Sequence, residues 1–102
     1  MGWASKYIEQ LQCGEVVQFR PSGNSMTPRI KSKQLVTVEP LGDAALAVGD
    51  IVLCKVNGRE FLHLIRSSRR DGDEIVYQIG NNKGFINGWT KAVFGRLSKV
   101  ED

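Results

Sequence analysis

Apolar and polar residues alternate along most of the chain after residue 14, and this period of two is typical of strands with one face on a core. Each alternating stretch ends at Gly, Asn, Asp or Pro, the residue types that favour turns. The predicted strands are residues 16–19, 34–39, 50–56, 60–66, 74–79 and 93–97. The pattern therefore predicts a mainly β fold.

Before residue 14 the apolar residues recur with helical spacing instead. Trp3, Tyr7, Ile8 and Leu11 fall on one side of a helix. We expect Ser5 to cap the start of this helix, and the glycine at position 14 to end it in a left-handed conformation. Packing of the helix against the sheet is favoured over docking to a partner.

The dipeptide Asn57-Gly58 lies between two apolar runs and predicts a type I′ hairpin turn. Such a turn fixes the register, so that Val52 faces His63 and Lys55 faces Glu60. Because side chains alternate between faces, His63 lies on the opposite face from Lys55. We expect Lys55 and Glu60 to form a surface ion pair worth less than about 1 kcal/mol.

The composition indicates one globular domain over residues 1–102, with a helix within residues 1–14 and a β core over 16–100. The net charge is +3. A composition of 41% apolar and 25% charged residues is typical of globular proteins and excludes a disordered or fibrous chain. No apolar run approaches the roughly 20 residues that cross a bilayer, and the first residues lack the pattern of a signal peptide. We therefore expect a soluble, cytoplasmic protein without a membrane anchor.

The potential metal ligands are few and scattered. Cys13 and Cys54 lack metal-ligand spacing, and the chain has one histidine. We expect free thiols, no metal site and no cofactor.

Residues 21–28, Pro-Ser-Gly-Asn-Ser-Met-Thr-Pro, hold a serine in a loop that suits a nucleophile. Gly23 and Asn24 tolerate the backbone angles of a tight turn, Met26 provides an apolar anchor beside the Ser25 hydroxyl, and Pro28 stiffens the chain. The same composition also occurs in ordinary turns.

Residues 25–28 resemble the Ser-Met-x-Pro box of the serine peptidase superfamily that contains signal peptidases and LexA-type repressors. Further segments resemble the family's later segments in the same chain order: Gly49-Asp50-Ile51-Val52, Phe61-Leu62-His63-Leu64-Ile65, Gly80-Asn81-Asn82 and Phe94-Gly95-Arg96-Leu97. The resemblance spans about residues 16–100. It implies a compact mixed β-sheet, coiled and barrel-like, with a short N-terminal helix.

The resemblance also implies a catalytic dyad of Ser25 as nucleophile and His63 as general base. Most members of the superfamily have lysine at the position of His63, whereas the signal peptidases of the endoplasmic reticulum have histidine. Those enzymes carry an aspartate where this chain offers Asn87, which would then orient the histidine. The competing interpretations are that His63 is a hydrogen-bonded core residue and that Asn87-Gly88 is a turn.

A second departure from the family concerns the oxyanion hole. Signal peptidases usually have a serine two residues before the nucleophile, and this chain has Gly23 there. The oxyanion would then depend on backbone N–H groups around Ser25, with Ser22 or Asn24 assisting.

The implied function is a soluble serine peptidase that cleaves an unidentified protein or peptide. The alternative is a catalytically inactive domain of the same fold that binds proteins or serves in assembly, and pairing into a homodimer fits either.

Nucleic acid is a disfavoured partner because no helix-turn-helix is visible and acidic residues interrupt the basic ones. The basic residues are Arg20, Arg29, Lys31, Lys33, Arg66, Arg69, Arg70 and Lys83. We expect Trp89 to plug one end of the sheet.

Overall fold

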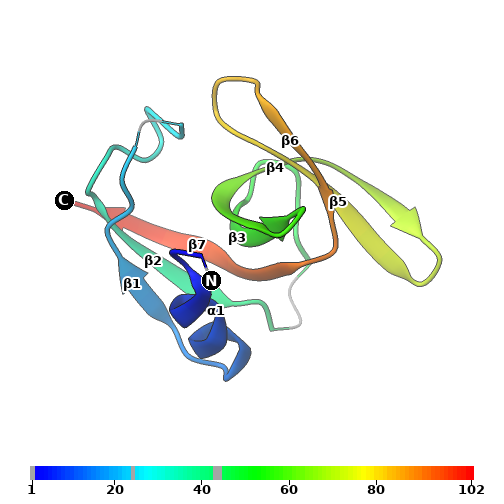
Figure 1. The fold of residues 1–102 in the computed structure, drawn as a ribbon, viewed down its shortest axis with the longest axis horizontal. Helices are drawn as coiled ribbons and strands as arrows, with labels where there is room; N and C mark the ends of the chain where they lie inside the picture. Colours follow the sequence, from blue (N-terminus) through cyan, green and yellow to red (C-terminus); the bar gives the residue numbers. More distant parts are fainter. Residues whose placement is uncertain (1, 24, 43–44) are drawn as a thin grey trace.

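The structure is a computed structural model that describes residues 2–23, 25–42 and 45–102. Its elements are α1 (Ser5–Gln12), β1 (Val17–Phe19), β2 (Leu35–Pro40), β3 (Ile51–Val56), β4 (Arg59–Asp71), β5 (Glu74–Gly80), β6 (Ile86–Thr90) and β7 (Val93–Glu101). The prediction of a mainly β fold with one short N-terminal helix is confirmed (Figure 1). Among the described residues, no helix has the length and apolar character to span a bilayer.

The strands form one sheet in the order β1-β2-β7-β3-β4-β5-β6. Every strand pair of the described residues is antiparallel, so the expectation of a mixed sheet is wrong. The sheet is strongly curled, since the Thr90 hydroxyl of β6 donates to the Lys55 carbonyl oxygen of β3 across 2.6 Å. This curling brings β6 near strands that are not its neighbours in the sheet (Figure 1).

The helix α1 packs on the sheet beside β1, β2 and β7, with Ile8 and Leu11 buried. It ends as predicted at Gly14, whose φ is +85°. The Gly14 N–H bonds the Leu11 carbonyl and the Glu15 N–H bonds the Gln10 carbonyl, which is the Schellman pattern. The role favoured for this helix, packing against the sheet, is the one observed.

The start of α1 differs from the prediction. Ala4, not Ser5, is the N-cap residue, and no side chain caps the helix. The Ser5 hydroxyl instead donates to the Glu60 carboxylate across 2.9 Å, and the Ala4 N–H donates to the other carboxylate oxygen across 2.6 Å. Glu60 is therefore buried at the helix N-terminus, where the helix dipole favours an anion, and the predicted surface ion pair with Lys55 is wrong.

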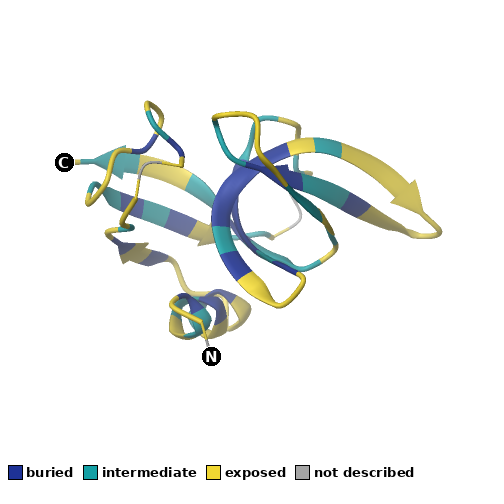
Figure 2. Cartoon of the chain, turned by 45° about the horizontal axis from the view of Figure 1, so that its top comes forward, coloured by how far each residue is buried: buried dark blue, intermediate teal, exposed yellow. Residues whose placement is uncertain are grey.

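The predicted register of the β3–β4 hairpin is confirmed, with Val52 opposite His63 and Lys55 opposite Glu60. Asn57 has φ +51° and the glycine after it φ +81°, as a type I′ turn requires. The two faces of β3 enter different parts of the core, with Leu53 on the side of α1 and Val52 on the other. Figure 2 shows the buried residues concentrated in β3 and the first half of β4.

Strand β6 is not among the strands that the sequence predicted. The dipeptide Asn87-Gly88 lies inside this strand, so its interpretation as a turn is wrong. Trp89 also lies on this edge strand, where 36% of it is exposed, so it does not plug the end of the sheet. The Arg69 guanidinium from β4 covers its ring, 4.5 Å from the ring centroid.

Candidate active site

The structure brings together the serine and the histidine that the sequence analysis paired. Ser25 lies in the connection between β1 and β2, residues 20–34, which we call the serine loop, and His63 lies on β4. The Ser25 Oγ is 3.1 Å from the His63 Nε2, although the residues are 38 positions apart in the chain. Ser25 is exposed, whereas only 8% of His63 is exposed.

Asn87 meets the other nitrogen of the same ring. The Asn87 Oδ1 is 2.7 Å from the His63 Nδ1, and a carbonyl oxygen can only accept a hydrogen bond. The Nδ1 therefore carries the proton, and the Nε2 presents its lone pair to the Ser25 hydroxyl. Phe61 stacks on one face of the imidazole, with ring centroids 5.0 Å apart.

Burial lowers the pKa of His63 below its usual value of 6.5, because the surrounding apolar groups disfavour the charged imidazolium. The hydrogen bond with Asn87 opposes this effect and raises the pKa, but it is the smaller cause. His63 is consequently a neutral base at pH 7. A neutral imidazole with its Nε2 free to accept is the form that can take a proton from a serine.

Asn82, in the β5–β6 connection, holds the serine loop in place. Its backbone N–H donates to the Ser25 carbonyl oxygen across 3.1 Å, and its side-chain amide donates to the Thr27 carbonyl oxygen across 2.9 Å. Asn81 shapes the same connection, because its Oδ1 accepts from the N–H groups of Lys83 and Phe85. The loop that carries the serine and the strand that carries Asn87 are thereby tied together.

The predicted binding residues of the serine loop differ in their positions. Gly23, with φ +103°, and Met26 both line the cavity beside Ser25, and Met26 is buried as the predicted apolar anchor. Pro28 is exposed, follows a cis peptide bond and does not line this cavity. The predicted contribution of Asn24 falls outside the described residues.

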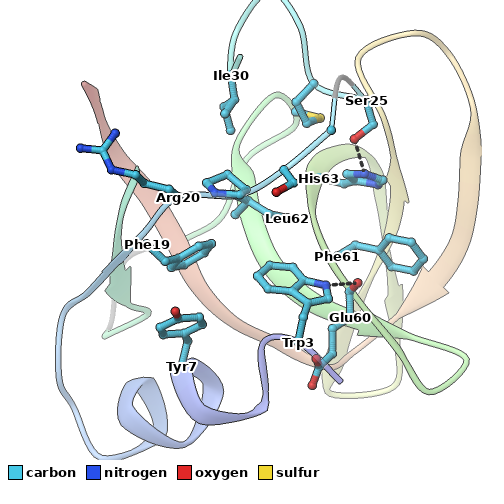
Figure 3. Close-up of a pocket in the computed structure, with 14 residues that line it drawn as sticks. Trp3, Tyr7, Phe19, Arg20, Ser25, Ile30, Glu60, Phe61, Leu62 and His63 are labelled. Atoms are coloured by element: carbon cyan, nitrogen blue, oxygen red, sulfur yellow. Dashed lines mark hydrogen bonds between the residues drawn. The ribbon is translucent and has the colours of Figure 1, made fainter. Parts of the chain in front are cut away.

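A cavity of about 460 Å³ extends from the serine and the histidine toward the N-terminal helix. Figure 3 shows Ser25 and His63 on one side of this cavity, and Trp3, Tyr7 and Phe19 on the other. Its remaining lining residues are Arg20, Pro21, Ser22, Gly23, Met26, Ile30, Glu60, Phe61 and Leu62.

Asn82, Trp3 and Glu60 belong to the site but were not among the predicted site residues. Asn82 could have been suspected, since two consecutive asparagines after a strand supply side-chain hydrogen bonds that shape loops. Trp3 and Glu60 gave no comparable signal, because their contact joins residues 57 positions apart.

No cluster of three or more potential metal ligands occurs within residues 2–23, 25–42 and 45–102. Both cysteines are free, with Cys13 exposed and Cys54 buried. Burial raises the pKa of the Cys54 thiol to about 12, so this thiol is not a nucleophile near neutral pH.

Two basic residues of the serine loop donate hydrogen bonds to backbone carbonyl groups. The Arg20 guanidinium donates to the Lys33 carbonyl oxygen across 2.9 Å, and the Arg29 guanidinium donates to the Gly49 carbonyl oxygen across 3.1 Å. These contacts hold the serine loop to itself and to the start of β3.

A comparison of the chain with models of known protein families finds no match, and a search of curated proteins finds no similar sequence.

Proposed function

We propose that this protein is a serine peptidase of the signal peptidase and LexA type, in which Ser25 and His63 form the catalytic dyad. The observation that carries the proposal is the 3.1 Å contact between the Ser25 Oγ and the His63 Nε2, with Asn87 bound to the opposite nitrogen. A nucleophile, a base within hydrogen-bonding reach and a third group that orients the base are the arrangement that activates a serine.

The chemistry follows from the protonation of the ring. As the Ser25 Oγ attacks the carbonyl carbon of a peptide bond, the His63 Nε2 takes the hydroxyl proton and later gives it to the leaving amine. Water then attacks the acyl-enzyme, with the same nitrogen as base, and releases the acid and the free serine. Asn87 holds the ring throughout but does not balance the positive charge of the imidazolium as a carboxylate would, which favours a slow enzyme.

The oxyanion of the tetrahedral intermediate needs donors beside Ser25. In this proposal they are backbone N–H groups of the serine loop, assisted by the hydroxyl of Ser22, which also lines the cavity. The Gly23 N–H is directed to the Ser32 hydroxyl, 3.2 Å away, and is not assigned to the oxyanion. Loss of one oxyanion donor typically costs about 3 kcal/mol of transition-state stabilisation.

The test is incubation of the protein with a defined mixture of peptides, followed by mass spectrometry, and with a fluorophosphonate probe of reactive serines. We expect peptide cleavage and a single adduct on Ser25, both abolished by Ser25→Ala and reduced by at least about a hundredfold in His63→Gln. Ser68→Ala is the matched control, because Ser68 is exposed on β4 beyond the site. An adduct that persists in Ser25→Ala would refute the proposal.

A second candidate function is a catalytically inactive binding or assembly domain of the same fold. The observation that favours it is β6, which is the last strand of the sheet among the described residues and carries the exposed residues Ile86 and Trp89, with exposed Phe85 before them. Exposed apolar residues on an unpaired edge are typical of surfaces that pair with another chain. An unreactive Ser25 together with a concentration-dependent mass in light scattering would favour this function, whereas labelling of Ser25 would exclude inactivity.

A further inference from the structure

The cavity beside Ser25 runs along the edge of a strand. Glu60, Phe61, Leu62 and His63 are consecutive on β4 and all line it. Consecutive side chains of a strand point to opposite faces, so four in a row can line one cavity only where it follows the strand's edge. Within the described parts of the chain, β5 pairs with β4 from Leu64 onward and no strand pairs with this edge before that point.

The register shows which backbone groups this edge presents. Val56 and Arg59 flank the two-residue turn and form a hydrogen-bonded pair, and such pairs alternate along the hairpin. Glu60 and Leu62 therefore direct their N–H and C=O groups away from β3 and toward the cavity. The Trp3 indole already donates to the Glu60 carbonyl oxygen across 3.3 Å. Among the residues that the structure describes, Leu62 is therefore the one on this edge with both backbone groups available for an added strand.

The far wall of the cavity is aromatic. Tyr7 and Phe19 stack with ring centroids 4.5 Å apart, and Trp3 tilts against Phe19 at 5.6 Å (Figure 3). The Glu60 carboxylate fixes this wall, because it accepts hydrogen bonds from the Ala4 N–H and from the hydroxyl of the residue that follows. The wall is thus anchored at both the indole and the helix start.

The polarity and size of the cavity select one kind of occupant. Arg20 lines it, and the Glu60 carboxylate is committed to the N-terminus of α1. Among the described lining residues, a cationic side chain therefore finds no free counter-charge. A volume of about 460 Å³ is far more than a methyl group fills, and stacked rings favour a further aromatic ring.

We propose that this cavity binds an extended peptide that pairs with Leu62 and places a bulky, preferably aromatic, side chain against Trp3, Tyr7 and Phe19. If Ser25 is the nucleophile, which is the proposed function on which this inference rests, the occupant is the substrate. The protein then selects a large apolar residue near the scissile bond.

Binding without cleavage tests this selectivity. The double variant Ser25→Ala and Trp89→Phe cannot use Ser25 and keeps Trp3 as its one tryptophan, so that fluorescence reports on the cavity. It is titrated with blocked alanine hexapeptides that carry one Phe, Leu or Lys at each position in turn, and with the all-alanine peptide. We expect Phe at one position to bind at least about tenfold more tightly than alanine and to shift the Trp3 emission, and Lys to bind no better than alanine.

The variants Tyr7→Ala and Trp3→Ala test whether the peptide side chain binds against the aromatic wall. They are compared in calorimetric titrations of the same peptides, after circular dichroism has shown that they are folded. The preference for Phe should fall to less than about twofold in both, while Ile75→Ala, an exposed residue of β5, leaves it unchanged. Equal affinities, a preference for Lys or alanine, no binding of any peptide, or a Phe preference that survives both variants would overturn the inference.

The proposed peptidase function is tested separately, by fluorophosphonate labelling of the Trp89→Phe protein, in which Ser25 is intact. Absence of fluorophosphonate labelling at Ser25, together with a clear Phe preference in the titrations, would leave a peptide-binding groove without peptidase activity. Labelling of Ser25 without any Phe preference would instead leave the peptidase and remove this selectivity.

Discussion

The side-chain amide of Asn82 donates a hydrogen bond to the Thr27 carbonyl oxygen, 2.9 Å away, and so ties the β5–β6 connection to the serine loop. Its backbone N–H reaches the Ser25 carbonyl oxygen at the same time. The position of the Ser25 hydroxyl opposite the imidazole thus depends on a residue that touches neither group.

Removal of the hydrogen bond between the Asn82 side chain and Thr27 should slow the reaction of the Ser25 hydroxyl. In Asn82→Asp the side chain keeps its size but loses the donor to Thr27, and a misplaced nucleophile costs about ten- to a hundredfold in rate. The rate of fluorophosphonate labelling at Ser25 measures the effect, with the neighbouring exposed residue in Lys83→Ala as control. Equal labelling rates in Asn82→Asp and wild type would show that the contact does not position the serine.

Asn87 should set the pKa of His63 in a predictable direction. Asn87→Ala removes the hydrogen bond that raises this pKa and should lower it further, whereas Asn87→Asp adds a negative charge and should raise it. Because the chain has one histidine, an NMR titration of the imidazole carbon-bound protons reads the pKa without ambiguity. A pKa that is the same in all three proteins would contradict the observed contact.

The lowered pKa of His63 also predicts how stability depends on pH. The unfolded chain takes up a proton near pH 6.5 while the folded protein does not, so the free energy of unfolding falls as pH drops through 6.5 and levels off below the folded pKa. Urea midpoints of wild type and His63→Gln between pH 5 and 8 isolate this effect, since the other groups are common to both. The two midpoints should converge toward acid if wild type is the more stable at pH 8. A difference between the two midpoints that stays constant with pH would refute the lowered pKa of His63.

The buried carboxylate of Glu60 should matter more to stability than its cross-strand neighbour Lys55. Glu60→Ala leaves the Ala4 N–H without its acceptor and should lower the free energy of unfolding by about 1–3 kcal/mol. Glu60→Gln keeps an acceptor and should lose less. Lys55→Ala should change stability by less than about 0.5 kcal/mol, and a loss as large as that of Glu60→Ala would restore the ion-pair interpretation.

Local rules predicted the fold well where the chain contacts itself over short distances. The Asn57-Gly58 turn dictates positive φ, and from it the whole β3–β4 register followed correctly. The same reasoning failed for Asn87-Gly88, because an identical dipeptide lies within β6. The glycine there adopts φ +142° with Val56 packed where a side chain would be, a requirement of the curled sheet rather than of a turn.

The site was predictable only in part for a similar reason. The pairing of Ser25 with His63 came from a resemblance between short segments, since nothing in the local sequence joins residues so far apart. Glu60 was expected in a surface ion pair because the hairpin register sets it opposite Lys55. Its burial depends on the N-terminus of a helix that folds back from the start of the chain, and no periodicity within β4 encodes that contact.

The most direct measurement of the central claim is the rate of fluorophosphonate labelling of Ser25 as a function of pH, compared with the NMR titration of His63. If the imidazole is the base, the rate rises with pH in one step whose midpoint matches the His63 pKa below 6.5, and the step is absent in His63→Gln. A labelling rate that has no inflection at this pKa, or that is unchanged in His63→Gln, would contradict the dyad.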